Sequence, residues 1–108
     1  MSQSGCSAGV TEPFALRVIG DSMAPEFNDG NIIIVDPGHP LVHGAYVVLE
    51  VAEEVYFGQY EQIDGDQRLR HLHPDFPVIP LQPGFTLKGV VVQRSTGRRK
   101  DLKHYEYL

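Results

Sequence analysis

Apolar residues occur along this chain in short runs that glycine and proline separate. Residues 14–19, 32–35, 45–51 and 55–63 are rich in β-branched and aromatic residues, and each run has the length of a strand. The run at 32–35 is continuously apolar, which is typical of a buried strand. No segment has the spacing of a long amphipathic helix, so the pattern predicts a mostly β domain.

Turn signals divide the second half of the chain into further strands. Residues 52–54 predict a hairpin, and Asp64-Gly65-Asp66 is a strong turn signal before a strand at 68–72. Shorter apolar segments at 78–79 and 85–93 predict the last strands. We therefore expect a curled sheet or a barrel whose strand edges need protection.

The length of 108 residues is that of a single domain. Residues 1–12 are rich in serine and glycine and predict a flexible leader. Residues 13–96 form the expected folded domain, and residues 97–108 the expected basic tail. Residues 22–27 leave room for at most one helical turn.

The cysteine content favours a cytoplasmic location. Cys6 is the single cysteine, so no internal disulfide can form, and we expect it to be an exposed residue without a chemical role. No apolar stretch has the length of a membrane span, and residues 1–10 lack the features of a signal peptide.

The net charge of −5 is unevenly distributed. Residues 1–93 hold four basic and twelve acidic residues, whereas residues 94–108 hold five basic and two acidic ones. Surfaces that bind nucleic acid need clustered cations, so the acidic body argues against direct DNA binding by this domain. We expect the tail to be a solvated end, with contact to an acidic partner as the alternative.

A small serine in a tight turn is the main candidate for chemistry. Gly20 lets the chain turn after the first strand, and Ser22 is the small polar residue of that turn. Met23 can fold back as an apolar plug. A hydroxyl nucleophile needs exposure, a base and backbone N–H groups for the oxyanion. The Gly-x-Ser tripeptide alone is also a common structural turn.

The longer pattern is more specific. Residues 14–23 and 28–35 resemble the serine-nucleophile segment of the LexA-like peptidases, the family of LexA, phage repressors and UmuD that is related to signal peptidases. Residues 44–48, 70–80 and 87–92 resemble the later strands of the same family in order and spacing. The resemblance implies a LexA C-terminal-domain-like fold, which is a curled, β-clip-like sheet or barrel.

The resemblance also implies a mechanism. Ser22 takes the position of the nucleophile, and the backbone N–H groups of Asp21 and Ser22 take the position of the oxyanion site. In the family a buried lysine, whose pKa desolvation lowers from about 10.4, accepts the serine proton. Family members pair through their closing strands, so residues 89–94 are the expected homodimer surface.

The lysine of this dyad is missing from the sequence. Counted from Glu54-Val55, its position is occupied by Gly58, and no lysine occurs before Lys88. Glycine has no side chain, so we expect an empty space where the base would lie. Loss of one member of a nucleophile–base pair removes most of the rate, because the two groups act as a unit.

Other basic residues remain as alternatives. An imidazole can act as the base of a serine hydrolase, and a lysine from the closing strand or the tail could reach the serine. These candidates are Lys88, His43, His71, His73, Lys100 and Lys103. We place His71 and His73 on one strand face, where they could hold a metal ion, but no third ligand is evident. We therefore expect no metal and no cofactor.

Two functions from different classes follow. The first is a degenerate LexA-like domain that acts as a dimerisation and regulatory module and binds a peptide or protein segment without cutting it. The alternative is an active serine endopeptidase that cleaves its own leader, for example at Ala8-Gly9, with a non-standard base. The leader is short for such folding back, and the residues before the domain leave no room for a helix-turn-helix.

Overall fold

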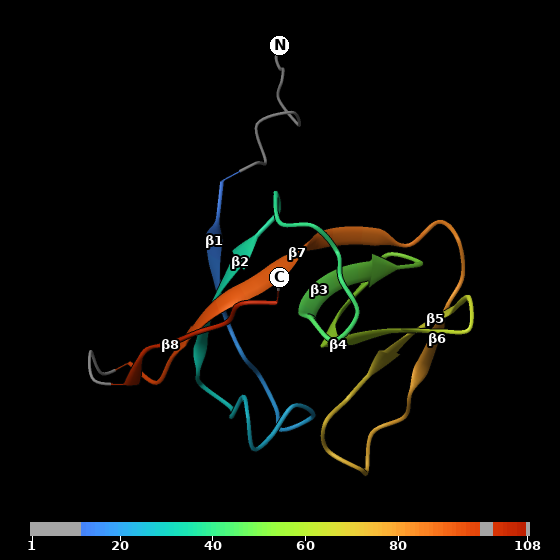
Figure 1. Cartoon of the computed structure of the whole chain (residues 1–108). Helices are drawn as coiled ribbons and strands as arrows, with labels where there is room; N and C mark the ends of the chain where they lie inside the picture. The colour runs from blue at the N-terminus through green and yellow to red at the C-terminus, as the bar shows by residue number, and fades with distance from the viewer. Residues whose placement is uncertain (1–11, 98–100, 108) are drawn as a thin grey trace.

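The structure is a computed structural model, and it describes residues 12–97 and 101–107. Within these ranges the chain forms one antiparallel sheet of eight strands (Figure 1). The strands are β1 Phe14–Arg17, β2 Ile32–Asp36, β3 Tyr46–Val51, β4 Glu54–Ile63, β5 Asp66–Arg70, β6 Ile79–Leu81, β7 Thr86–Ser95 and β8 Lys103–His104.

The order of neighbouring strands is β1-β2-β7-β3-β4-β5-β6, and β8 pairs with β7 outside this path. β2 pairs with one edge of β7 from Val90 to Ser95. The other edge is shared, because β3 pairs with the stretch that ends at Val90 and β8 pairs with Gln93 and Arg94. Both edges of the closing strand are therefore hydrogen-bonded within one chain.

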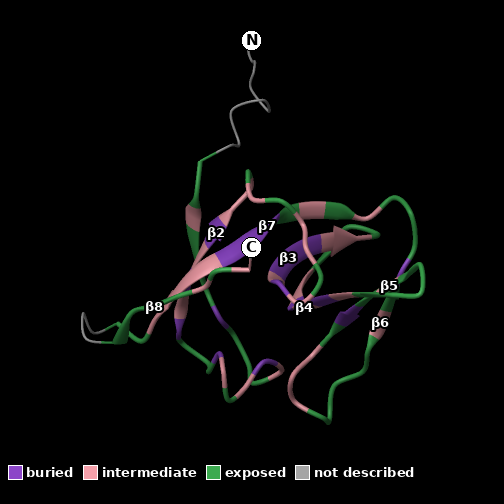
Figure 2. Cartoon of the chain, viewed as in Figure 1, coloured by how far each residue is buried: buried purple, intermediate pink, exposed green. Residues whose placement is uncertain are grey.

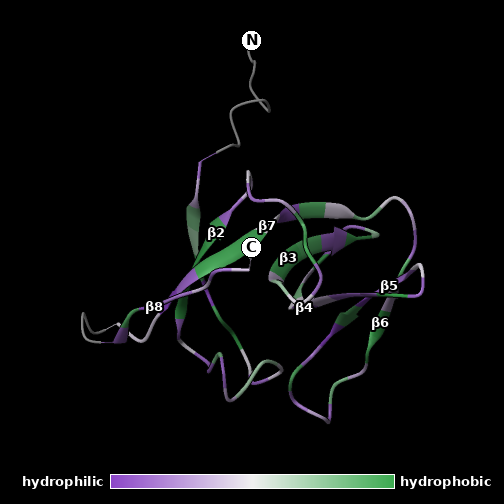
Figure 3. Ribbon diagram, viewed as in Figure 1, coloured by the Kyte–Doolittle hydropathy of each residue, from purple (hydrophilic) through white to green (hydrophobic). Residues whose placement is uncertain are grey.

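Two apolar clusters lie on opposite faces of β3 and β7. Val48 and Val91 belong to the first cluster, whereas their neighbours Val47 and Val90 belong to the second. Successive side chains of a strand point to opposite faces, so a strand between two clusters must be apolar throughout. Buried and hydrophobic residues accordingly coincide on these two strands (Figures 2 and 3).

The prediction of a mostly β domain is confirmed, and the described residues contain no α-helix. Two tight turns set the strand registers: Ala52 and Glu53 both have positive φ, and so do Asp64 and Gly65. Positive φ at both central residues matches the twist of a hairpin. No helix of the described part is long and apolar enough to cross a membrane.

The strand expected at 68–72 is displaced. The turn at Asp64 and Gly65 is so short that β5 already begins at Asp66, and it ends at Arg70. The segment from His71 to His73 therefore follows the strand, and the prediction that both histidines share one strand face was wrong.

The end of the chain also differs from the expectation. Instead of a solvated end, Lys103 and His104 pair with β7, and Tyr105 and Tyr107 pack against the two apolar clusters. The red segment in Figure 1 runs back beside β7 for this reason. Residues 98–100 and the leader residues 1–11 lie outside the described part of the chain, and so does Cys6. The domain boundaries stay predictions.

Candidate functional site

Two backbone N–H groups of the turn that carries Ser22 donate hydrogen bonds that fix its conformation. Gly20 has a φ of 88°, a conformation that favours glycine, and its N–H donates to Asp29 Oδ1 at 2.7 Å. Within the turn, the N–H of Ala24 donates to the Asp21 carbonyl at 3.1 Å. The segment Asn28-Asp29-Gly30 thus fixes the backbone on which Ser22 sits.

The same turn contributes to the core. Met23 and Phe27 are fully buried in the first cluster, and the N–H of Phe27 donates to the Met23 carbonyl at 2.9 Å. The ring of Phe27 makes edge contacts with Tyr46 and Phe57 at centroid distances of 4.9 and 5.0 Å. Such aromatic pairs stabilise a fold beyond the area they bury. Met23 is therefore the apolar plug that the sequence predicted.

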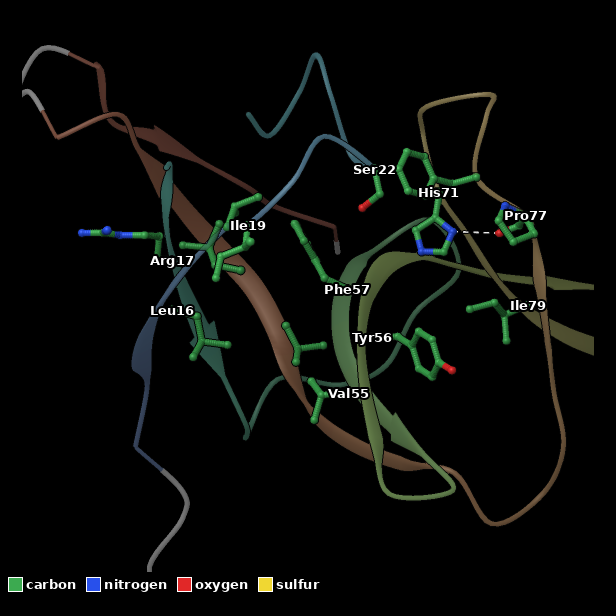
Figure 4. Close-up of a pocket in the computed structure, with 14 residues that line it drawn as sticks. Leu16, Arg17, Ile19, Ser22, Val55, Tyr56, Phe57, His71, Pro77 and Ile79 are labelled. Carbon is green, nitrogen blue, oxygen red and sulfur yellow. Dashed lines mark hydrogen bonds between the residues drawn. The ribbon is translucent and has the colours of Figure 1, made fainter. Parts of the chain in front are cut away.

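An open apolar groove of about 600 Å³ runs beside Ser22. In Figure 4, Leu16 and Ile19 form one wall, and Pro77 and Ile79 form the opposite wall. Phe57 lies between the walls. A concave, mostly apolar surface with a few polar groups is the usual form of a ligand site.

The segment after β5 joins the serine turn to the groove. The N–H of His73 donates to the Ser22 carbonyl at 3.0 Å. His71 lines the groove with Ser22, and its Nδ1–H donates to the carbonyl of Pro77 at 2.8 Å (Figure 4). A donor at Nδ1 leaves Nε2 as the acceptor of a neutral imidazole. Ser22 and His71 are thus the nucleophile and the base candidate that the fold places in one groove.

The space expected at Gly58 is not empty. Gly58 is buried in β4, and a Cβ built on it would lie 2.7 Å from Leu69 Cγ and 3.0 Å from the carbonyl oxygen of Arg70. The 2.7 Å distance is shorter than real Cβ contacts and the 3.0 Å distance is tight, so a side chain at 58 needs Leu69 to move. The groove is lined by Phe57 and not by Gly58. The expectation of a vacant base position was wrong, because β5 packs its leucine there.

The lysines of the described segments have carboxylate partners. Lys88 Nζ lies 3.0 Å from Glu50 Oε1, and Lys103 Nζ lies 2.7 Å from Glu26 Oε2. Neither lysine lines the groove. Lys100, the other tail candidate, lies outside the described residues.

The remaining histidines are engaged elsewhere. His43 Nδ1 accepts from the N–H of Gln62 at 3.0 Å, and His73 Nδ1 accepts from the N–H of Asp75 at 3.1 Å. Neither side chain lines the groove. Across the described ranges, no group of three or more His, Cys, Asp or Glu residues could hold a metal ion.

The oxyanion assignment to Asp21 and Ser22 stays a prediction. Asp21 is exposed and Ser22 is half-buried. Among the backbone hydrogen bonds of the described residues, the carbonyls of Asp21 and Ser22 act as acceptors, and neither N–H acts as a donor. Two such N–H groups are what an oxyanion site requires.

Comparison with known proteins decides the family. The sequence profile described as Peptidase S24-like matches residues 5–92. The chain belongs to this family. Its mostly β fold and the turn around Ser22 fit this membership.

The similar curated proteins carry regulatory names. The chain is 42% identical over 88 residues to the HTH-type transcriptional regulators for conjugative elements R391 of Providencia rettgeri and SXT of Vibrio cholerae, covering 74% of this chain and 40% of each relative. It is 36% identical over 95 residues to the prophage repressor CohE of Escherichia coli K12, covering 83% of this chain and 42% of the relative. The chain therefore spans about two fifths of these proteins' length.

Sequence reasoning missed the contacts of Glu26. This residue follows the serine turn, and its Oε2 lies 2.7 Å from Lys103 Nζ, 2.6 Å from the Tyr105 hydroxyl and 3.4 Å from Arg94 Nη1. In the sequence it is one of many acidic residues of the body. The cluster of cations near the end of the chain was the available signal, because an acidic body can bind a basic segment of its own chain.

Proposed function

We propose that this chain is the regulatory peptidase-family domain of a repressor-type protein and that its Ser–Lys dyad is degenerate. The observation that carries the proposal is the packing of Leu69 at Gly58, the position where the family resemblance puts the base. The regulatory names of the relatives support the biological setting. Because these relatives are longer than the chain, the activity of the whole protein is part of the proposal.

In this proposal the groove binds a peptide or protein segment without cutting it. The walls offer Leu16, Ile19 and Ile79 to apolar side chains, and Ile19 is 83% exposed. Burial of exposed apolar surface would drive the binding of such a segment. The acidic character of residues 1–93 supports a module that binds protein and not DNA.

Homodimerisation belongs to the same proposal. The expected surface, residues 89–94, lies in β7, and Val90 and Val91 are fully buried. Because β2, β3 and β8 already pair with this strand, a second chain would contact the outer face of β8 or replace it. A structure of the dimer would therefore show whether β8 of the same chain or a strand of the second chain pairs with β7.

The test is the intact mass of the protein after long incubation at alkaline pH. We expect the masses of the wild type and of Ser22→Ala to stay equal, because in this proposal no side chain acts as the base for Ser22. Cleavage products that form in the wild type and are lost in Ser22→Ala would overturn the degenerate site. They would favour the peptidase alternative, for example with a cut at Ala8-Gly9.

One observation favours a second candidate, a serine hydrolase that uses His71. Ser22 and His71 share the groove, and the bond to Pro77 leaves Nε2 free of hydrogen. In such a reaction the Ser22 Oγ attacks a carbonyl carbon while its proton moves to Nε2. The leaving amine takes that proton, and water then hydrolyses the acyl-serine.

A pair of matched variants separates the two candidates. His71→Gln removes the base from the groove, whereas His73→Gln changes the histidine two positions later that lies outside it. Under the first proposal neither variant changes the yield of any product. Under the second candidate His71→Gln loses the cleavage that Ser22→Ala loses, and His73→Gln keeps it.

A further inference from the structure

The chain continues beyond β7. The family match ends at residue 92, whereas residues 101–107, here termed the C-terminal strap, return onto the sheet. Beyond the β8 pairing, the N–H of Tyr105 donates to the Val92 carbonyl at 3.0 Å. The hydroxyl of Tyr107 donates to the Val91 carbonyl at 2.7 Å. The strap is thus fixed to β7 through both backbone and side chains.

The polar end of the strap binds the segment that carries Ser22. Lys103 Nζ and the Tyr105 hydroxyl donate to the same oxygen of Glu26 at 2.7 and 2.6 Å. Arg94 of β7 donates to the Glu26 carbonyl and lies 3.4 Å from its carboxylate. Glu26 is separated from Lys103 by 77 positions in the sequence, so these contacts are tertiary.

The charges at this contact are complementary. Burial alone would raise the pKa of the Glu26 carboxyl, but hydrogen bonds from Lys103 and Tyr105 and the positive charges of Lys103 and Arg94 lower it. Burial, the Glu26 hydrogen bond and the nearby negative charge raise the pKa of Tyr105. The carboxylate is therefore ionised and the phenol protonated at neutral pH, which is the pairing that the hydrogen bond needs.

The apolar side of the strap reaches the groove through two rings. Tyr105 packs on Phe27 at a centroid distance of 5.4 Å, and Phe27 packs on Phe57 at 5.0 Å. Phe57 and Ser22 both line the groove. A continuous set of contacts therefore runs from the strap through the buried part of the serine turn to the surface beside Ser22.

We propose that the C-terminal strap, through its docking at Glu26, positions the Ser22 turn against the groove. The proposal concerns the conformation of the turn and rests on the proposed function only in treating the groove as a binding site. It stands whether or not Ser22 cleaves. Glu26 and Tyr105 are positioning residues, because they act on Ser22 through the backbone of residues 23–27.

Release of the strap would leave the pairing of the rest of the sheet intact. Of its seven residues only Tyr105 and Tyr107 are half-buried, and the other five are exposed. When it leaves, β7 keeps its pairing with β2 and β3. Segments with few buried contacts are the ones that open locally, well before global unfolding.

The test uses hydrogen exchange on the full chain, followed residue by residue. The release variant is Lys103→Ala combined with Tyr105→Ala, which removes both strap contacts to Glu26. The matched control is His104→Ala combined with Glu106→Ala, which changes the alternate, exposed positions of the same segment. The reporters are the amides of Ala24 and Phe27, which donate within the serine turn.

We expect the release variant to exchange these two amides at least about tenfold faster than wild type, while the Tyr60 amide of β4 and the control variant stay unchanged. If the strap amides exchange faster in the release variant but the exchange rates of the Ala24 and Phe27 amides stay unchanged, the proposal is overturned. If the release variant does not fold, Tyr105→Phe removes the hydroxyl alone and must give a smaller acceleration at the same two amides. The absence of that acceleration in a folded Tyr105→Phe protein contradicts the proposal equally. Because cleavage is not read, failure of the strap and failure of the degenerate-site proposal are separate results.

Discussion

The serine turn and the strand position of Gly58 are the two halves of the dyad that the family resemblance implies, and the chain treats them differently. The turn is fully built: Gly20 is bonded to Asp29, and Met23 and Phe27 are buried in the core. At Gly58 no side chain can fit without moving Leu69. Position 58 is therefore packed against its neighbouring strand, whereas Ser22 lines an open groove.

The difference shows that the serine turn has structural roles that do not depend on catalysis. Its buried residues stabilise the fold, and its backbone receives the His73 N–H at the Ser22 carbonyl, so the turn has structural reasons to persist. The Ser22 side chain itself is not needed for these contacts. An intact Gly-Asp-Ser-Met segment is therefore weak support for peptidase activity in this chain.

Truncation of the buried part of the turn should have the largest effect on stability. Phe27→Ala removes a fully buried ring with three aromatic neighbours, and it should lower the free energy of unfolding by about 3–5 kcal/mol. Ser22→Ala, which leaves those contacts intact, should change it by less than about 0.5 kcal/mol. Urea unfolding of both variants measures the contrast. Equal losses would show that the serine hydroxyl is structural.

The next largest effect on stability should come from adding a side chain at position 58. Gly58→Ala places a carbon 2.7 Å from Leu69 Cγ, and it should cost about 1–3 kcal/mol of stability through overpacking. The loss should be smaller when it is measured in a Leu69→Ala background, which a double-mutant cycle quantifies. Additive losses would mean that the leucine does not occupy this space.

The same contrast predicts how a restored lysine behaves. Gly58→Lys alone should not produce Ser22-dependent cleavage, because Leu69 blocks the path of the new side chain. Gly58→Lys combined with Leu69→Ala opens that path, so cleavage should appear in the double variant. The intact mass after alkaline incubation measures cleavage in both variants. Cleavage by the single Gly58→Lys variant would show that the position is open after all.

Removal of the hydrogen bond at the edge of the turn should have a moderate effect. Asp29→Ala leaves the Gly20 N–H without its acceptor, and the typical net loss for such an exposed bond is about 1 kcal/mol. Asp29→Asn keeps an acceptor oxygen and should lose less. Thermal unfolding of the two variants ranks them, and the reverse order would argue that charge and not the bond matters.

The smallest effect should appear in acid, at the contact of the strap with the turn. The pKa of Glu26 in the folded chain is below its ordinary value of 4.5, so its stabilisation is present above that value and is lost as the pH falls through the lowered pKa. The pKa values of Tyr105 and Tyr46 are raised, so both phenols stay protonated in this range. We expect the Tyr105 backbone resonances to shift toward those of a free chain in acid. Glu26→Gln should remove this pH dependence, and a shift that persists in that variant would assign it to another group.

Much of the fold could be predicted from the sequence. The apolar runs predicted the strands, because burial on one face leaves an alternating pattern and burial on both faces leaves a continuous apolar run. β3 and β7 carry continuous apolar runs. The register of β5 could not be predicted as well, since the turn at Asp64 and Gly65 uses only two residues. His71, which the sequence placed within a strand, follows the end of β5 at Arg70 and lines the groove.

The rest depended on contacts between distant positions. The sequence has a glycine at position 58, but only the fold shows that Leu69 of the neighbouring strand fills the space beside it. The basic residues after β7 suggested a solvated end, because charge alone does not reveal that Glu26 is within reach. Local patterns therefore predicted the serine turn, whereas the packing at Gly58 and the contacts of the tail required the tertiary structure.

The most direct test of the degenerate site is the reaction of the protein with a fluorophosphonate at alkaline pH, read by intact mass. This probe reports the nucleophilicity of a serine and needs no knowledge of the substrate. The account predicts no Ser22 adduct in the wild type, as in Ser22→Ala. A stoichiometric adduct on Ser22 that the Ser22→Ala variant lacks would contradict it, since it would require an effective base beside the serine.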